Sequence, residues 1–347
     1  MRVLFRPDLS AALGSGHAMR DLAVAEALVA AGDEVVYACD TTGLAWIERA
    51  ILDSGCQIEP PHGTVCEVAQ RVGADAVLVD SYTLPTSDYD EVRARYLPLV
   101  AVVDGVRRGA RADVLVDPGP VTETDWQADL QAGQLILYGV DYALVRHEFR
   151  ASTVSGRQES VPLRLLVTFG GTDAHGAAPA IAAAVLALGR PVELTVVARD
   201  DLRDRIGRLE LADGQRLTLV SPGGGFADLI HAHDVVVSAA GSTAWELLAM
   251  GAATGLVCVA DNQERYYRAL PEAGAALAVG TLAEVTVGVA RVADTLRTLV
   301  DDPGLRARLR TNARRVVDGR GGERVATELR HLVQAASGGL SAKDAAP

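Results

Sequence analysis

The sequence has few cysteines, no excess of basic residues and no long hydrophobic run. Its four cysteines are scattered without a CxxC pair, so neither a disulfide framework nor a zinc site is indicated. Asp and Glu outnumber Lys and Arg by 45 to 33, and the net charge of -12 disfavours general binding to nucleic acid or to an anionic membrane surface. No stretch approaches the roughly 20 apolar residues of a membrane span. Arg6 and Asp8 cut the first apolar run short, so we expect no signal peptide and a cytoplasmic protein.

A chain of 347 residues, 49% of them hydrophobic, is long enough for two domains with buried cores. Short apolar segments alternate with helical patterns, and they lack period-two alternation, as strands covered on both faces do. The predicted strands cover residues 1–5, 34–38, 74–79, 97–103, 112–116, 163–169, 192–197, 217–220, 234–238 and 255–259. This alternation predicts an α/β fold with parallel sheets and helices on both faces.

A polar segment with Ser, Gly and Pro interrupts the alternation at 151–162 and predicts a linker. We therefore expect an N-terminal Rossmann-like domain over 1–150 and a C-terminal one over 163–336. The remaining 337–347 has no apolar periodicity and predicts a flexible tail. Because ligands of open α/β sheets bind at the carboxyl ends of strands, the expected site is a cleft between the two domains.

A glycine-rich turn with a histidine, GSGHAMR (14–20), stands between the first predicted strand and a predicted helix. Its glycines permit a sharp turn and close approach of a ligand to the backbone. His17 falls at the helix N-terminus, where the dipole disfavours imidazolium, so we expect a neutral imidazole that can act as a base. The alternative is a tight turn in which His17 caps the helix. Met19 breaks the dinucleotide fingerprint GxGxxG, which argues against a nicotinamide dehydrogenase.

A run of small residues leads from a predicted strand into a helix at AAGSTAWE (239–246). Ser242 and Thr243 place hydroxyls beside free backbone N–H groups, which is a ready site for phosphate oxygens. Glu246 follows one turn later and could accept hydrogen bonds from a ribose diol. The alternative is a helix N-cap with an acidic first turn, which leaves the small residues unexplained.

Three further segments carry weaker signals. Gly170 and Gly171 end a predicted strand and allow close approach to a diphosphate. The loop SPGGGF (221–226), which ends at Phe226, is long enough to wrap a planar base. Asn262 and Gln263 carry uncharged donors and acceptors that suit sugar hydroxyls, although an ordinary polar turn has the same composition.

In their order along the chain, these segments resemble the UDP-sugar hydrolase family of the pseudaminic-acid pathway and its spore-coat polysaccharide biosynthesis relatives. The matching pieces are Arg6 and Asp8, GSGHAMR (14–20), VDSYTL (79–84), YALVRHEF (142–149), VTFGGTD (167–173), AAGSTAWELLAMG (239–251) and ADNQ (260–263). The resemblance implies a glycosyltransferase-B-like fold, in which two Rossmann-like domains face each other across a cleft. The family is also similar to the lipid-linked N-acetylglucosaminyltransferase of peptidoglycan synthesis.

The resemblance implies hydrolysis of a UDP-linked diacetamido-trideoxy sugar at the anomeric carbon, with release of UDP and free sugar. It implies that His17 is the catalytic base and that Tyr82 and Asn262 lie near the sugar. The expected substrate-binding residues are Gly14, Ser15, Gly16, Arg20, Gly170, Gly171, Phe226, Gly241, Ser242, Thr243, Glu246 and Gln263. A positioned water, a neutral His and a stabilised leaving group suit this chemistry. No pattern of metal ligands stands out, so we expect neither a metal nor a cofactor.

Three positions depart from the family pattern. Asp104-Gly105 stands where the family usually has Asp-Asp, Asp117 stands where Asn is frequent, and His147 replaces a proline. All three flank the half expected to face the sugar, so the sugar and the acceptor stay open. The alternative function is a UDP-sugar-dependent glycosyltransferase with the same donor site. A third possibility is a non-catalytic protein that binds nucleotide sugars. The oligomeric state is open.

Overall fold

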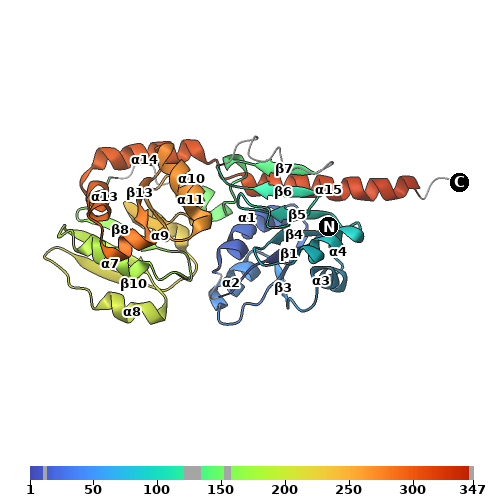
Figure 1. Ribbon diagram of the computed structural model, residues 1–347, viewed down its shortest axis with the longest axis horizontal. Helices are drawn as coiled ribbons and strands as arrows, with labels where there is room; N and C mark the ends of the chain where they lie inside the picture. The colour runs from blue at the N-terminus through green and yellow to red at the C-terminus, as the bar shows by residue number, and fades with distance from the viewer. Residues whose placement is uncertain (11–13, 121–133, 152–157, 344–347) are drawn as a thin grey trace. The chain divides into compact units, whose positions relative to one another are not determined.

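The computed structural model describes residues 1–10, 14–120, 134–151 and 158–343 (Figure 1). The chain divides into two compact units. The first unit comprises residues 1–10, 17–146 and 320–347, and the second comprises 11–16 and 147–319. No helix among the described residues has the length and apolarity needed to cross a membrane.

The first unit, over its described residues, contains a sheet of seven strands in the order β3-β2-β1-β4-β5-β6-β7, and every neighbouring pair is parallel. This is the doubly wound order, in which the chain reverses its direction of winding between β1 and β4. The strands are β1 (Arg2–Pro7), β2 (Glu34–Ala38), β3 (Gln57–Glu59), β4 (Ala76–Asp80), β5 (Leu99–Val102), β6 (Val114–Asp117) and β7 (Leu135–Tyr138). Its helices are α1 (Gly16–Ala30), α2 (Ala45–Asp53), α3 (Val65–Val72), α4 (Thr86–Ala94), η1 (Val140–Tyr142) and α15 (Gly321–Lys343).

The apolar strands of this sheet are buried on both faces. In β1, Val3 and Phe5 belong to the core that contains Leu22 of α1, whereas Leu4 belongs to the opposite core with Val68 of α3. The strands therefore need no polar face, which explains why their sequences lack alternation. Helix boundaries follow local signals: Thr64 begins α3 with a capping box, and Gly73 ends it in the left-handed conformation.

Helix α15, at the carboxyl end of the chain, packs on the first unit rather than on the second (Figure 1). Val325, Ala326 and Leu329 are buried in the same core as Leu22 of α1. Arg330 pairs with Asp33 at 2.9 Å between Nη1 and Oδ2. The sequence prediction that residues up to 336 belong to the second domain therefore differs from this arrangement, because helical periodicity reveals an apolar face but not the core that it joins.

Two glycines allow the start of α15 to approach the backbone of the first unit. A Cβ atom on Gly322 would lie 2.2 Å from the carbonyl oxygen of Ala23, and one on Gly321 would lie 2.3 Å from that of Ala143. Real Cβ atoms do not tolerate such distances from backbone atoms, so a larger residue requires a backbone shift.

We expect Gly322→Ala to lower the free energy of unfolding by about 1–3 kcal/mol, because overpacking against rigid backbone displaces α15 from the core. Urea unfolding measures this change. Gly223→Ala is the matched control, since no atom lies within 4 Å of its Cβ position. Equal stability of the two variants would contradict the close approach of α15 to α1.

The second unit, within the described part of the chain, contains a sheet of six parallel strands in the order β10-β9-β8-β11-β12-β13. Its change of winding direction lies between β8 and β11. The strands are β8 (Leu163–Thr168), β9 (Val192–Val197), β10 (Arg216–Val220), β11 (Val235–Ala239), β12 (Thr254–Cys258) and β13 (Leu277–Thr281). The helices are α6 (His147–Ala151), α7 (Ala178–Leu186), α8 (Asp200–Gly207), α9 (Phe226–Ala232), α10 (Ser242–Met250), η2 (Asp261–Gln263), α11 (Glu264–Glu272), α12 (Leu282–Val287), α13 (Ala290–Asp301) and α14 (Pro303–Val316).

The ten predicted strands all have counterparts in the two sheets, and the predicted α/β class is confirmed. Three strands were not predicted: β3, which has only three residues, and β7 and β13, which lie at sheet edges. Half of the predicted linker, residues 152–157, lies outside the described residues. The predicted tail at 337–347 overlaps α15, which continues to Lys343, and residues 344–347 are not described.

Candidate functional site

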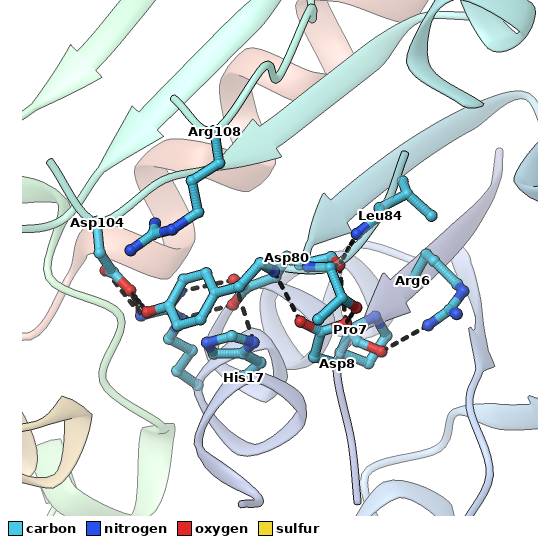
Figure 2. A network of polar contacts seen from close by, with 12 residues as sticks. Arg6, Pro7, Asp8, His17, Asp80, Leu84, Asp104 and Arg108 are labelled. Atoms are coloured by element: carbon cyan, nitrogen blue, oxygen red, sulfur yellow. Dashed lines mark hydrogen bonds and ion pairs between the residues drawn. The ribbon is translucent and has the colours of Figure 1, made fainter. Parts of the chain in front are cut away.

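Carboxylates gather in the first unit where β1, β4 and β5 end (Figure 2). Asp8 follows β1, Asp80 ends β4 and Asp104 follows β5, and all three are buried. Parallel strands end at one edge of a sheet, and here β1 and β4 flank the point where the winding reverses. The sheet topology therefore brings these acidic side chains to the edge where α/β proteins bind ligands.

Arg20 joins two of these carboxylates from helix α1. Its Nε and Nη2 atoms donate to both oxygens of Asp80 at 2.5 and 2.6 Å, and its Nη1 donates to Asp104 at 2.9 and 3.0 Å. Burial by itself raises the pKa of Asp104, but the charge of Arg20 and a hydrogen bond from Tyr82 outweigh it and lower this pKa to about 2. Arg20 therefore holds two buried negative charges in place.

His17 is the second residue of α1 and lies beside this cluster. Its Nδ1 lies 3.8 Å from Oδ1 of Asp80, and its side chain is 14% exposed. That separation exceeds a hydrogen bond, and Nδ1 is buried without a hydrogen-bond partner among the described residues. A small rotation would bring His17 within bonding distance of Asp80. The position leaves Nε2 as the nitrogen that can serve a bound molecule.

Tyr82 packs against His17 and donates its hydroxyl to Asp104. The two rings lie 4.3 Å apart at 81°, an edge-to-face arrangement. Burial, with the charge of Asp104, raises the pKa of Tyr82, so its hydroxyl stays protonated and acts as a donor. The guanidinium of Arg108 lies 4.0 Å from the centre of the same ring. Tyr82 thus connects His17, Asp104 and Arg108.

Asp8 fixes the turn that carries Tyr82. Its oxygens accept from the Ser81 hydroxyl at 2.7 Å, the Tyr82 amide at 2.7 Å and the Thr83 hydroxyl at 2.9 Å. In Figure 2, Arg6 turns away and bonds the Pro7 carbonyl instead. The sequence singled out Arg6 and Asp8 together, but only Asp8 supports the residues around His17.

Asp21 lies fully buried one residue after Arg20, and neither carboxylate oxygen has a hydrogen-bond partner among the residues described. Burial, then repulsion from Asp80, raise the pKa of Asp21. The unfolded chain releases this proton near an ordinary pKa of about 3.9, whereas the native state keeps it. The free energy of unfolding therefore falls as pH rises from that value through the raised native pKa.

We expect Asp21→Asn to remove this dependence, because the amide has a similar shape and cannot ionise. Urea unfolding at a series of pH values from about 4 to 7 should show that the variant gains stability relative to wild type as pH rises. Asp53→Asn, at an exposed position in α2, is the matched control and should give a curve parallel to wild type. A curve for Asp21→Asn that parallels wild type would mean that Asp21 is ionised when folded.

In the second unit, the two segments singled out in the sequence follow neighbouring strands at the change of winding direction. Gly170 and Gly171 follow β8 after one intervening residue, Phe169, and Gly170 has φ of +70°, a conformation that favours glycine. The following Asp173 accepts from the Ala177 and Ala178 amides at 2.9 and 3.0 Å. These bonds tie the glycine turn to the start of α7.

The turn after β11 leads into helix α10. The N-cap residue is Gly241, so no side chain caps the first N–H groups of this helix. Ser242 and Thr243 start the helix and are partly exposed, whereas Glu246 is only 6% exposed. The Oγ atom of Ser238, near the end of β11, is buried without a hydrogen-bond partner in the described structure. Free N–H groups at a helix start suit anionic oxygens.

Gln263 and Asn262 occupy η2, after β12. The Oε1 atom of Gln263 accepts from the Val259 amide at 3.1 Å, and its Nε2 lies 3.4 Å from the position of a Cβ on Gly241. Gln263 therefore lies beside the turn before α10, while Asn262 is exposed. Phe226 starts α9 and packs edge-on against Phe149, with ring centres 6.1 Å apart.

The remaining predicted residues form the turn before α1. Gly14 has φ of +90°, which requires glycine, Ser15 is 6% exposed, and Gly16 starts the helix. Residues 11–16 group with the second unit, and 11–13 lie outside the described residues.

Within the first unit the structure brings together three predicted residues, His17, Arg20 and Tyr82. Within the second it brings Gly241 beside Gln263 and Gly16 beside Ser242. Sequence reasoning did not identify the supporting residues Asp21, Asp80, Asp104 and Arg108 as part of the site. Two of these, Asp80 and Asp104, carry a recognisable signal, since each is an acidic residue at the end of a buried strand.

The departures from the family pattern have local structural explanations in two cases. Gly105 has φ of +71°, where an aspartate would be strained. The fully buried Asp117 accepts from the Gly119 amide at 3.0 Å. His147 is the first residue of α6. Among the described residues, no group of three or more His, Cys, Asp and Glu side chains could hold a metal ion.

Comparison with known proteins shows likeness in structure only. No protein-family model matches the chain, and no curated protein matches it by sequence. MurG from Acinetobacter baumannii has a TM-score of 0.66 at 17% identity, over 95% of this chain and 99% of that one. The spinosyn rhamnosyltransferase SpnG with thymidine diphosphate has 0.63 at 18%, over 96% and 100%. The S. aureus MnaA complex with UDP has 0.64 at 12%, over 96% of each chain. With two parallel sheets of doubly wound order, the chain has the glycosyltransferase-B fold.

Proposed function

We propose that this protein is an enzyme that cleaves a UDP-sugar at the anomeric carbon, with His17 as general base. The leading substrate is a UDP-linked diacetamido-trideoxy sugar, and the acceptor is water. One observation carries the proposal: His17 lies 3.8 Å from the buried Asp80 and against Tyr82, at the ligand-binding edge of a doubly wound sheet. A histidine supported by a buried carboxylate is a suitable base.

In this mechanism His17 Nε2 accepts a proton from the attacking water. The water oxygen forms a bond to the anomeric carbon, while the bond from that carbon to the diphosphate oxygen breaks and UDP leaves with the electron pair. The imidazolium then donates from Nδ1 to Asp80, once the 3.8 Å separation shortens. Before substrate binds, hydrogen bonds between catalytic groups are often longer than they are in the reacting complex.

The second unit would hold the nucleotide. Ser242 and Thr243 start a helix without a side-chain cap, so their backbone N–H groups can bind the diphosphate and stabilise it as it leaves. Gly170 and Gly171 follow the neighbouring strand and leave the backbone accessible. Glu246 would bind the ribose, and Asn262 and Tyr82 would lie near the sugar. The turn from Gly14 to Gly16, with Phe226 and Gln263, completes the proposed contacts.

A UDP-sugar-dependent glycosyltransferase fits the same arrangement at least as well. In that case a hydroxyl of an acceptor molecule replaces water, and His17 removes its proton in the same way. This alternative is supported by the spinosyn rhamnosyltransferase among the similar structures. The donor half of the mechanism is unchanged, and only the attacking oxygen differs.

Release of nucleoside diphosphate without an added acceptor tests the proposal. The panel contains the UDP-linked diacetamido-trideoxy altrose, UDP-N-acetylglucosamine and dTDP-rhamnose, and calorimetry with UDP and dTDP reports binding. We expect sustained UDP release from the altrose derivative without any added acceptor. UDP binding without turnover would favour the transferase, and the absence of binding to either nucleotide would contradict both functions.

A further inference from the structure

The loop between β5 and β6 holds an arginine in a conformation that favours glycine. Arg108 has φ of +46°, and the next residue, Gly109, has φ of +80°. A left-handed conformation is unfavourable for an ordinary L-residue, because its Cβ atom comes too close to the following carbonyl oxygen. Such strain persists where the surroundings fix the residue, and it is frequent at functional sites. The backbone conformation favours glycine at this position, so the presence of an arginine must be explained by its side chain.

The side chain extends over the ring of Tyr82, with the guanidinium carbon 4.0 Å from the ring centre. A cation–π contact at an exposed position is weak, because water screens the charge. Arg108 is exposed, and its only other contact given by the described residues is a 3.4 Å hydrogen bond from Nη1 to the Val106 carbonyl. These two contacts at most offset the backbone strain, so they do not account for an arginine here.

The charge of Arg108 has no carboxylate partner in the described part of the chain. Two other arginines of this loop have side-chain partners: Arg107 donates to Gln134 at 2.8 Å, and Arg111 pairs with Asp90 at 3.1 Å. The carboxylates nearest to Tyr82 are already satisfied, since Asp104 accepts from both Arg20 and Tyr82. An unpaired guanidinium therefore lies over the ring of Tyr82, the same ring that packs against His17, in a strongly acidic chain.

We infer that Arg108 binds an anionic group, a carboxylate or a phosphate, on the molecule that reacts at His17. This inference rests on the proposed function and names the substrate chemistry of the first unit: the sugar or the acceptor is acidic. Stacking on Tyr82 fixes the plane of the guanidinium and leaves the edges of its fork free for two parallel hydrogen bonds. A lysine at the same position would supply charge without that geometry.

Nuclear magnetic resonance of the arginine side-chain Nε–H groups tests the inference without requiring turnover. The Arg108 signal is assigned by its loss in Arg108→Gln. Wild type saturated with UDP is titrated with glucuronate or glycerol phosphate, and with glucose or glycerol as their neutral counterparts. We expect the Arg108 signal to shift with at least one anionic probe and with neither neutral one. The responding probe distinguishes carboxylate from phosphate.

The affinity for that probe should fall about tenfold in Arg108→Gln, the effect of losing one charge-assisted contact. Arg111→Gln removes an equal charge from the same loop and should leave the affinity unchanged. No shift with either anion, or equal shifts with the neutral probes, would overturn the inference. So would a shift caused by UDP alone, because the nucleotide would then be the partner of Arg108. A protein that releases no UDP but shows the expected shift would contradict the proposed function and retain the anion site.

Discussion

Replacing His17 with glutamine is expected to lower nucleoside diphosphate release by about a hundredfold to ten-thousandfold, the range for loss of a general base. The amide preserves a polar side chain of similar reach but cannot take up the proton. UDP affinity should be unchanged, because the proposed nucleotide contacts come from the second unit. The measurements are steady-state turnover of the responding UDP-sugar and calorimetric binding of UDP.

The pH profile separates a base from a structural histidine. The rate of a reaction that depends on a general base rises with pH, and the residual rate of the variant should lack this rising limb. His62→Gln, at an exposed position, is the control and should retain the wild-type rate and profile. Turnover of His17→Gln within about twofold of wild type would remove His17 from the mechanism.

Replacing Arg20 with methionine is expected to lower the free energy of unfolding by about 3–5 kcal/mol, because it leaves buried carboxylates without their counter-charge. Both oxygens of Asp80 and both of Asp104 accept from this one guanidinium. The exposed pair of Arg164 and Glu193 supplies the control, since Arg164→Met should cost less than about 1 kcal/mol. Urea unfolding at neutral pH measures both.

The effect of Arg20→Met should depend on pH in a defined direction. In wild type the pKa of Asp104 is lowered to about 2, so its ionised form stabilises the protein above the unfolded pKa, and that contribution is lost as pH falls. The difference in the free energy of unfolding between wild type and variant should therefore shrink below about pH 4. Adding Asp104→Asn to the variant should recover part of the stability at neutral pH. A difference in the free energy of unfolding that stays constant across this range would mean that the variant loses stability through packing and not through charge.

The sequence predicts the sheets well because their strands are apolar on both faces. Segments such as Val235–Ala239 need no information from elsewhere in the chain to be recognised as buried strands. Three edge strands, β3, β7 and β13, were missed: β3 is three residues long and has no buried side chain, and β7 has only one. Their pairing depends on the strand beside them, which local pattern does not reveal.

The sequence likewise identifies some residues of the candidate site and misses others. His17, Arg20 and Tyr82 belong to recognisable motifs, so the sequence identifies them. Asp80 and Asp104 are 24 residues apart and meet through Arg20, a contact that only the sheet order explains. The position of Arg108 depends on a left-handed backbone conformation in a loop, and arginine carries no signal for such a conformation.

The return of α15 to the first unit sets an order for folding during synthesis. Domains generally fold as units, the N-terminal one first, as they leave the ribosome. Here the second unit, which ends at residue 319, is complete before α15 has been made. The first unit, although its sheet is translated earlier, lacks Val325 and Leu329 in its core until the last helix emerges. Until then this core is incomplete, so the half of the protein that carries His17 reaches its native packing last.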